Sequence, residues 1–245
     1  MARVTRRFRW LTLAVAGLSF LLASAMMQKV SAETVAVIGT GRVGSALGPR
    51  FAALDYKVVY GSRNPSSDDV VALVARTGGE AAAATQQDAA IQAEIIVLAI
   101  PWSATGQVVK DLGDLDGKII IDVTNAIEFV KGGQMQMAVD TSAGELVQSW
   151  APGASVVKAF NTISFTVMAN TDAAGGPVTV PIAGNDEEAK QKIAGIIQAM
   201  GFETMDVGPI RNARVLESMT IIYMVPYLRG RREDTFEFYF RRLPQ

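Results

Sequence analysis

The chain has 245 residues, of which 49% are hydrophobic, and it contains no cysteine and no histidine. This length and composition suit one or two globular α/β units with a sizeable core. The missing residue types exclude disulfides, the usual zinc ligands and the usual general base at neutral pH.

Residues 1–32 have the order of an export signal. Four arginines lie among the first nine residues, residues 10–28 carry no charge, and the small residues Val30–Ala32 suit a signal peptidase. The pair Arg6 and Arg7 is also the mark of the twin-arginine route to the periplasm or cell envelope. Two alternatives stay open: an uncleaved membrane tether through residues 10–28, or a cytoplasmic protein that starts at Met26 or Met27.

The charge of the remaining chain argues against one class of partner. Residues 1–32 hold five of the 23 basic residues and no acid, so the rest has 18 basic against 24 acidic residues, a formal charge of −6. This balance gives no indication of a nucleic-acid partner.

The first predicted strand leads into a glycine-rich turn. Val35–Ile38 is a short apolar run, and Gly39, Gly41 and Gly44 follow it with the spacing G-x-G-x-x-G before a helix with apolar residues at helical spacing. In a dinucleotide site the first glycine makes the turn, the second lets the backbone approach the pyrophosphate, and the third lets helix and strand pack closely. The pattern therefore predicts dinucleotide binding at the start of this helix.

The second predicted strand, Lys57–Tyr60, indicates which dinucleotide binds. It ends in Gly61-Ser62-Arg63-Asn64, where an NAD site would carry an acidic residue for the ribose 2′-hydroxyl. Arg63 can instead bind a 2′-phosphate bidentately, and Ser62 can donate one more hydrogen bond. We therefore expect NADP(H) in preference to NAD(H).

The later strands place further side chains at the same edge of the sheet, where ligands of open α/β sheets bind. Beyond a short strand at Glu80–Ala84, the predicted strands are Ile95–Ile100, Lys118–Val123, Ser155–Phe160, Val178–Ala183 and Phe202–Asp206. The first three of these five lead to Pro101-Trp102, Thr124-Asn125 and Asn161-Thr162. Trp102 is either a wall of the nicotinamide site or a surface aromatic residue at a helix start.

Helices are predicted between these strands. They cover Ser66–Arg76, Gln87–Gln92, a capping box at Ser142 with a helix to Trp150, a helix capped by Asn185, and a helix opened by Pro209. In the last, Val215–Val225 is mostly apolar and is expected to be buried against the sheet or a second subunit, which would make a homodimer. Glu217 follows Arg214 by three residues, which favours an intrahelical ion pair. Residues 126–140 are expected to form a long irregular loop.

Several motifs together resemble the NADP reductases that use a deazaflavin coenzyme, and the related cytosolic domain of the six-transmembrane metalloreductases. They are Val37–Gly44, Gly61–Arg63, Leu98–Trp102, Asp122–Asn125, Val157–Thr162 and Ala183-Gly184. The resemblance implies that Thr40, Ser62 and Arg63 hold the 2′-phosphate. It also implies that Ile100–Trp102 and Phe160–Thr162 lie around the nicotinamide.

The predicted fold class is a doubly wound Rossmann-type α/β sheet, mostly parallel, with a C-terminal α/β extension. The predicted parts are the signal or anchor 1–32, the reductase domain 33–228 and a basic, aromatic tail 229–245. The predicted cofactor-binding residues are Gly39, Thr40, Gly41, Arg42, Val43, Gly44, Ser62, Arg63, Asn64, Ile100, Pro101 and Asn125, and those on the acceptor side are Trp102, Phe160, Asn161 and Thr162.

The implied reaction is hydride transfer between NADP(H) and a flat, small-molecule redox acceptor such as a deazaflavin or flavin. Transfer between two stacked rings needs alignment more than an acid or base, which fits a chain without histidine. No catalytic acid–base residue and no metal site is predicted. Two alternatives stay open: a non-catalytic NADP-binding sensor, or reduction of a small imine or ketone with Lys158 or Thr162 as proton donor.

Overall fold

The computed structural model describes residues 33–230, 237–241 and 243. The predicted export segment and part of the predicted tail lie outside these residues. Among the described helices, none has both the length and the apolar composition needed to cross a bilayer.

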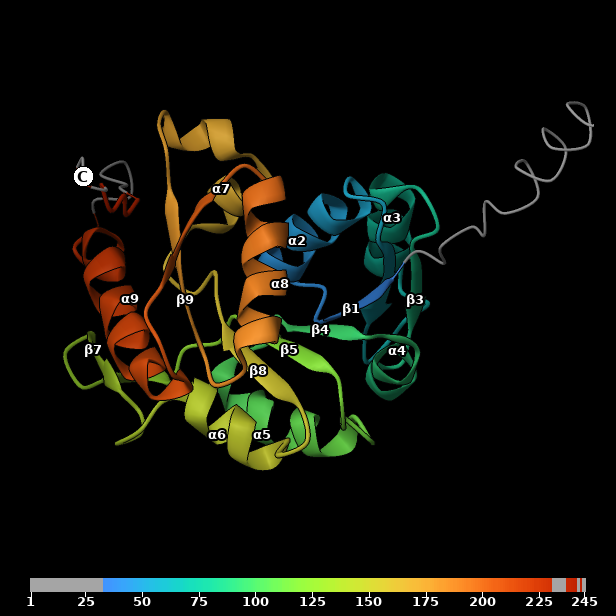
Figure 1. Cartoon of the computed structure of the whole chain (residues 1–245), viewed down its shortest axis with the longest axis horizontal. Coiled ribbons are helices and arrows are strands. Elements are labelled where there is room, and N and C mark those ends of the chain that lie inside the picture. Colours follow the sequence, from blue (N-terminus) through green and yellow to red (C-terminus); the bar gives the residue numbers. More distant parts are fainter. Residues whose placement is uncertain (1–32, 231–236, 242, 244–245) are drawn as a thin grey trace, which may run out of the picture. The chain divides into compact units, whose positions relative to one another are not determined.

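An eight-stranded sheet forms the centre of the described chain (Figure 1). Its order is β10-β9-β8-β5-β4-β1-β2-β3, and all neighbours pair in parallel except β8 and β9, which are antiparallel. The strands are β1 (Thr34–Ile38), β2 (Lys57–Gly61), β3 (Ala82–Ala84), β4 (Ile95–Leu98), β5 (Ile119–Asp122), β8 (Ser155–Lys158), β9 (Thr179–Gly184) and β10 (Glu203–Asp206). This is the predicted doubly wound, mostly parallel fold.

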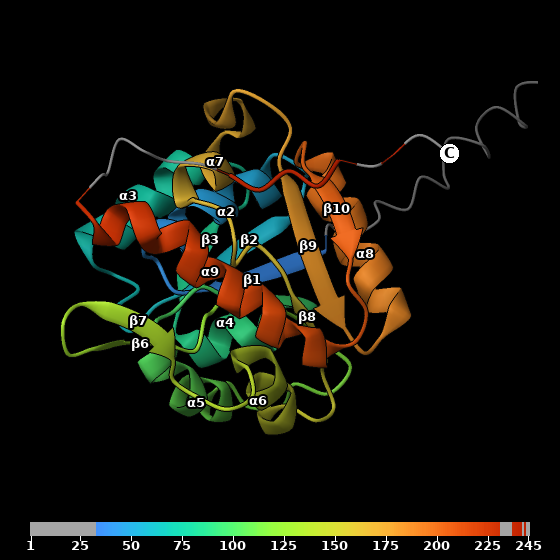
Figure 2. The ribbon, with the colours of Figure 1, turned by 90° about the vertical axis from the view of Figure 1, so that its left-hand side faces the viewer.

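Helices cover both faces of the sheet (Figures 1 and 2). Side chains of α2 (Arg42–Ala52), α3 (Asp68–Thr77), α7 (Phe165–Ala169) and α8 (Glu187–Ala199) belong to one core, and those of α4 (Gln86–Gln92), α5 (Trp102–Asp111), α6 (Ala143–Trp150) and the start of α9 (Ala213–Leu228) to the other. Within β1, Val35 and Val37 face the first core, whereas Ala36 and Ile38 face the second. Strands covered on both faces are continuously apolar for this reason.

The strand order places a crevice at the carboxyl end of β1. From β1 the chain builds β2 and β3 on one side, then crosses to β4 on the other side and continues outward to β5 and β8. Such a reversal is where ligands of doubly wound sheets bind. The residues predicted for the site follow β1, β2, β4, β5 and β8, so the topology brings them to one edge.

Residues 126–140 are not an irregular loop, as the sequence analysis expected. They contain an antiparallel hairpin of β6 (Ile127–Val130) and β7 (Gln134–Met137). The chain turns at Gly132 and Gly133, whose φ angles of 92° and 74° favour glycine. A Gly-Gly pair between two short runs is typical of a hairpin, so the expectation of an irregular loop is wrong.

One predicted helix cap is wrong, and the prediction for the last helix is tested only in part. The N-cap of α8 is Asp186, whose carboxylate accepts a hydrogen bond from the Ala189 N–H, while Asn185 accepts from the Ile210 N–H. One side of α9 is buried within the chain, where Leu216 is 2% exposed, whereas Val215 is 62% exposed and Ile222 is 57% exposed on the other side. Burial of that other side against a second subunit stays a prediction. By contrast, the Ser142 cap of α6 is confirmed.

Residues 237–240, the part of the predicted tail for which contacts are described, lie beside the start of β9. The Phe238 carbonyl accepts a hydrogen bond from the Thr179 N–H at 3.0 Å, and the Phe240 N–H donates to the Thr179 hydroxyl at 3.0 Å. Glu237 accepts from the Ser164 N–H at 3.1 Å, and burial raises the pKa of its carboxyl. Figure 2 shows this segment crossing α7 and β9.

Candidate active site

The glycine-rich turn has the geometry that a dinucleotide needs. Gly39 has a φ of 109°, and a Cβ there would collide with the Ala99 carbonyl oxygen. A Cβ on Gly44 would collide with the Gly39 carbonyl oxygen, so this glycine sets the close packing of α2 on β1. A Cβ on Gly41 would meet no protein atom within 4 Å. The absence of a side chain at Gly41 therefore leaves room for a ligand rather than for the protein.

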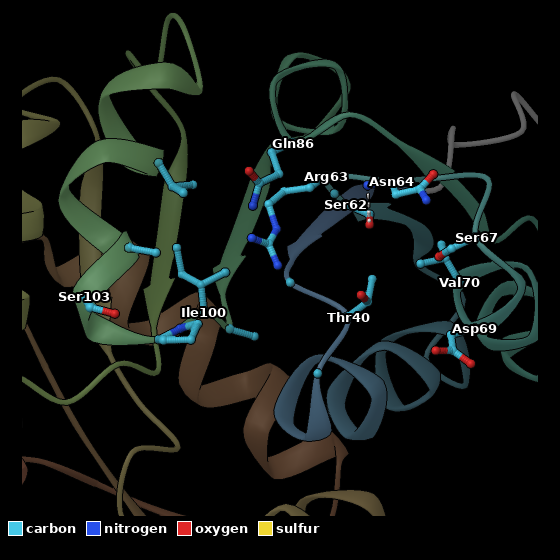
Figure 3. Close-up of a pocket in the computed structure, with 17 residues that line it drawn as sticks. Thr40, Ser62, Arg63, Asn64, Ser67, Asp69, Val70, Gln86, Ile100 and Ser103 are labelled. Atoms are coloured by element: carbon cyan, nitrogen blue, oxygen red, sulfur yellow. Dashed lines mark hydrogen bonds between the residues drawn. The ribbon is translucent and has the colours of Figure 1, made fainter.

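A cavity of about 660 Å³ opens at this turn (Figure 3). Eight of the predicted residues line it: Gly39, Thr40, Gly41, Ser62, Arg63, Asn64, Ile100 and Pro101. They come from the ends of β1, β2 and β4, which the sheet order places side by side. The cavity therefore lies at the crevice that the topology predicts.

Arg63 and Ser62 are poised to meet an anion in this cavity. Figure 3 shows the Arg63 side chain reaching into the cavity between Gln86 and Thr40. Within the part of the chain that the structure describes, Arg63 has no hydrogen-bond or ion-pair partner, and it is the one basic residue lining the cavity. The Ser62 hydroxyl oxygen accepts the Asn64 N–H at 3.1 Å, which leaves its own proton free to donate.

Other lining residues were not predicted. They include Ser67, Asp69, Val70, Gln86, Ser103, Ala104 and Val108, mostly from the first turns of α3, α4 and α5. Helix starts next to a phosphate site were the available signal, because their free N–H groups face the same edge. Asp69 lies across the cavity from Arg63 (Figure 3). The lining of the cavity therefore carries one charge of each sign.

The remaining predicted residues lie outside the lining of this cavity. Arg42 lies over the Phe165 ring at 5.4 Å, while Val43 and Gly44 pack α2 against the sheet. Trp102 stacks on Trp150 with ring centroids 5.9 Å apart. Asn125, Phe160, Asn161 and Thr162 follow β5 and β8, farther along the same edge.

The chain after β8 is held in an unusual backbone conformation. Phe160 has a φ of 61°, which a non-glycine residue adopts at a cost of about 1–3 kcal/mol. Its buried ring packs edge-to-face on Phe202 with centroids 6.1 Å apart. The next two residues, Asn161 and Thr162, are also buried, and the Asn161 Oδ1 and Thr162 Oγ1 atoms have no hydrogen-bond partner among the described residues. A ligand reaches Thr162 only if neighbouring side chains move.

Helix α9 joins the loops that follow β5 and β8. Asn161 Nδ2 lies 3.0 Å from Asn125 Oδ1 and 2.9 Å from the Leu216 carbonyl oxygen. Thr220 Oγ1 lies 2.9 Å from Asn125 Oδ1 and 3.0 Å from the Asn161 carbonyl oxygen. Both loops are therefore fixed to the same two turns of one helix.

A buried charge cluster lies beneath these loops. Lys158 Nζ is 2.7 Å from Asp122 Oδ2, 2.8 Å from Glu217 Oε1 and 2.6 Å from the Thr124 carbonyl oxygen. All three charged side chains are 0% exposed. The expected pair between Glu217 and Arg214 is wrong, because Arg214 instead binds Glu145 through two hydrogen bonds of 2.7 Å.

Lys158 is also poorly placed to donate a proton to a substrate. Its ammonium group has three donors, and each has an acceptor within 2.8 Å inside the protein. Within the described residues there is, in addition, no group of three or more potential metal ligands.

The cavity fits NADP(H). The open space at Gly41 and the start of α2 suit the pyrophosphate, and the unpaired Arg63 with the Ser62 hydroxyl suits a 2′-phosphate. The residues suited to the pyrophosphate follow β1 and those suited to the 2′-phosphate follow β2, yet both groups line one cavity.

Comparison with known proteins gives the same assignment. The sequence model of the family described as "NADP oxidoreductase coenzyme F420-dependent" matches residues 34–126. The F420-dependent NADP reductase of Methanothermobacter thermautotrophicus is 28% identical over 220 residues, which cover 84% of this chain and 94% of that protein. Metalloreductase STEAP3 of Rattus norvegicus is 30% identical over 194 residues, but the match spans only 37% of its length.

Solved structures extend the likeness over most of the chain. A candidate F420-dependent NADP reductase of Arthrobacter sp. FB24 has a TM-score of 0.75 and 28% identity, covering 84% of this chain and 99% of that one. A reductive aminase and an imine reductase of Aspergillus terreus are only 15% and 16% identical, with TM-scores of 0.59 and 0.58, and share the fold alone. From its cavity and these matches we conclude that the chain is an NADP-dependent oxidoreductase whose residues 34–126 are similar to the family that this sequence model describes.

Proposed function

We propose that the protein transfers a hydride between NADP(H) and a flat redox ring of the deazaflavin or flavin type. The observation that carries this proposal is the pairing of a cavity suited to NADP(H) with a neighbouring edge whose charged groups are all satisfied inside the protein. Such an edge supplies alignment and no acid or base. Ring-to-ring hydride transfer needs the same.

The bound cofactor would supply a hydride from the C4–H bond of its dihydronicotinamide, which oxidises NADPH to NADP⁺ and reduces the acceptor ring, and the one proton that the ring takes up with the hydride would come from water. The chain's own residues bind and orient. Arg63 and Ser62 hold the 2′-phosphate end, Gly41 and the start of α2 hold the pyrophosphate, and the loops after β4, β5 and β8 flank the reacting end.

The buried state of Lys158 favours this reaction over reduction of an imine or ketone, because that chemistry ordinarily needs a proton donor at the substrate. Lys158 was one of two donor candidates, and its ammonium group is fully used inside the protein.

The test is NADPH oxidation by the purified protein against a panel of acceptors: a deazaflavin, free flavins, ferric chelates and cyclic imines. We expect turnover with the first two classes. Turnover with imines alone, or tight NADPH binding with no acceptor reduced, would overturn the proposed acceptor class.

We also propose that residues 1–32 direct the protein to the periplasm or cell envelope, from the order of basic, apolar and small residues in the sequence. Mass spectrometry of protein from its native host should then find a chain that begins at Glu33. A cytosolic chain that begins at Met26 or Met27 would contradict export, and a full-length chain in the membrane fraction would indicate the tether.

A further inference from the structure

The cluster of Lys158, Asp122 and Glu217 also binds backbone groups of neighbouring segments. Glu217 Oε2 accepts the N–H groups of Ala126 at 3.1 Å and Ala143 at 2.9 Å, and Oε1 accepts the Gly144 N–H at 3.1 Å as well as the Lys158 ammonium. One carboxylate thus ties α9 to the loop after β5, to the first turn of α6 and to the end of β8.

Asp122 fixes the same loop from the other side. Its Oδ1 accepts the Thr124 N–H at 2.9 Å and the Thr124 hydroxyl at 2.7 Å, while Lys158 binds the Thr124 carbonyl oxygen. Hence the N–H and carbonyl of Thr124 and the N–H of Ala126 are all bound within the cluster. Asn125, between them, is the residue whose side chain meets Asn161 and Thr220.

Stability alone is a weak explanation for three buried charges. Removing ions from water costs several kcal/mol each, and well-packed apolar replacements are often as stable or more so. A hydrogen-bonded ion cluster does, however, fix geometry, because each donor and acceptor has one favourable position. The left-handed Phe160 immediately after Ala159 supports this, since such a conformation persists only where the surroundings enforce it.

We propose that Glu217, Lys158 and Asp122 are positioning residues: acting with Thr220, they set the loops 124–126 and 160–162 against the nicotinamide end of the cofactor. The nicotinamide end is assigned to these loops because the glycine turn and Arg63 occupy the β1–β2 side of the crevice, so the rest of the dinucleotide extends toward β5 and β8. This inference rests on the proposed hydride transfer.

The decisive variant is Glu217→Gln. A glutamine has the same shape but one oxygen, so either orientation points an NH2 group at backbone N–H donors that now meet a carboxylate oxygen. If the oxygen stays with Lys158 and Gly144, the NH2 group pushes against Ala126 and displaces the loop. Thr220→Val is the second variant; it removes one hydroxyl without removing a charge and keeps the side-chain shape.

The matched control is Arg214→Gln. Arg214 also joins α9 to α6, through Glu145, but its side chain is 39% exposed and neither partner contacts the two loops. A general loosening of α9 would affect the control as well, whereas a loss of loop position would not.

Two readouts on the full chain test the proposal. The first is the affinity for NADPH divided by the affinity for 2′-phospho-ADP-ribose, a ligand that lacks the nicotinamide. We expect Glu217→Gln and Thr220→Val to lower this ratio by about three- to tenfold, with 2′-phospho-ADP-ribose itself bound as in wild type. The second is kcat with the best acceptor, which we expect to fall by about ten- to a hundredfold for Glu217→Gln, because small misplacements of reacting groups cost this much.

The outcomes separate the two proposals. If the wild type binds NADPH but reduces no acceptor, the proposed function fails, and the affinity ratio still tests the positioning role. If the wild type turns over and both variants keep its ratio and its kcat, with only a lower melting temperature, the cluster is merely structural and the inference is overturned. If Glu217→Gln does not fold, Thr220→Val decides alone by the same two readouts.

Discussion

The two halves of the predicted site are built in opposite ways. On the β1–β2 side, the cavity is open, its one cation lacks a partner among the described residues, and a Cβ on Gly41 would meet only empty space. On the β5–β8 side, loops and strand ends are buried, and nearly every polar group finds its partner within the protein. The first half has open space for a ligand, whereas in the second only the Asn161 Oδ1 and Thr162 Oγ1 atoms lack a partner among the described residues.

This difference suggests that the β1–β2 side binds the cofactor and that the β5–β8 side positions its reacting end. Unpaired groups that a ligand can neutralise give affinity, whereas groups already bound to one another add little affinity and instead fix the distance between reacting parts. Substitutions in the two halves should therefore have different signatures, in ligand affinity on one side and in folding or turnover on the other.

The largest effect is expected from Lys158→Met. It leaves the carboxylates of Asp122 and Glu217 buried without a cation, which typically costs about 3–5 kcal/mol. Urea unfolding should show a correspondingly lower free energy of unfolding. Breaking the half-exposed pair by Arg214→Gln should cost only about 0–1 kcal/mol. Similar losses for the two variants would show that the buried cluster has no special role in stability.

Arg63→Ala should weaken NADPH binding by roughly ten- to a hundredfold, which corresponds to a charge-assisted hydrogen bond of about 1.5–3 kcal/mol. NADH lacks the 2′-phosphate and should bind the variant as it binds wild type. Titration calorimetry with both cofactors gives the comparison, and the free energy of unfolding should not change, because Arg63 is exposed. Equal losses for NADPH and NADH would place the 2′-phosphate elsewhere.

The two glycines that open α2 should respond differently. A Cβ on Gly44 meets the Gly39 carbonyl oxygen, so Gly44→Ala should destabilise the fold by about 1–3 kcal/mol as overpacking does. Gly41 has a φ of −75°, which alanine adopts freely, so Gly41→Ala should melt as wild type does but bind NADPH more weakly. Thermal melts and cofactor titrations of both proteins check this. Unchanged NADPH affinity for Gly41→Ala would mean that the pyrophosphate does not approach that turn.

The smallest effect concerns pH. Without histidine or cysteine, no side chain has an unperturbed pKa between about pH 6 and 8, so kcat should change by less than about twofold there, apart from the acceptor's own titration.

The carboxyl of Glu237 is the group to control for, because burial raises its pKa. A raised folded pKa means that this group favours the folded state at low pH and loses that contribution as pH rises above about 4.5 through the folded pKa. Glu237→Gln should remove that slope from the unfolding free energy and leave the rate profile unchanged.

Sequence alone was enough for the open half of the site and for most of the sheet. The turn at Gly39–Gly44 and the Arg63 position are local patterns, and each is defined within ten residues of a strand whose apolar run marks it. The prediction for residues 126–140 is wrong although the signal for a hairpin is also local, since Gly132-Gly133 stands between the two strands that pair.

The closed half could not be predicted in the same way. Glu217 contacts Lys158, 59 positions earlier, and Ala126, 91 positions earlier, and nothing in the spacing of one sequence indicates such pairs. Helical spacing alone favours the nearest opposite charge, Arg214, as the partner of Glu217. Only the tertiary fold reveals that α9 turns Glu217 inward and Arg214 toward Glu145.

The long separation within the cluster also has a consequence for the order in which the protein is completed during synthesis. Asp122 and Lys158 are available once β8 has been made, but the carboxylate that binds the Ala126, Ala143 and Gly144 N–H groups comes only with α9. A nascent chain that ends before residue 217 contains every residue that lines the cavity but lacks the carboxylate that binds the loop after β5 and the start of α6. Contacts this distant in sequence form late, because the intervening loop must first be ordered. The residues that line the cofactor cavity are therefore all synthesised before Glu217, the residue proposed to position the reacting end.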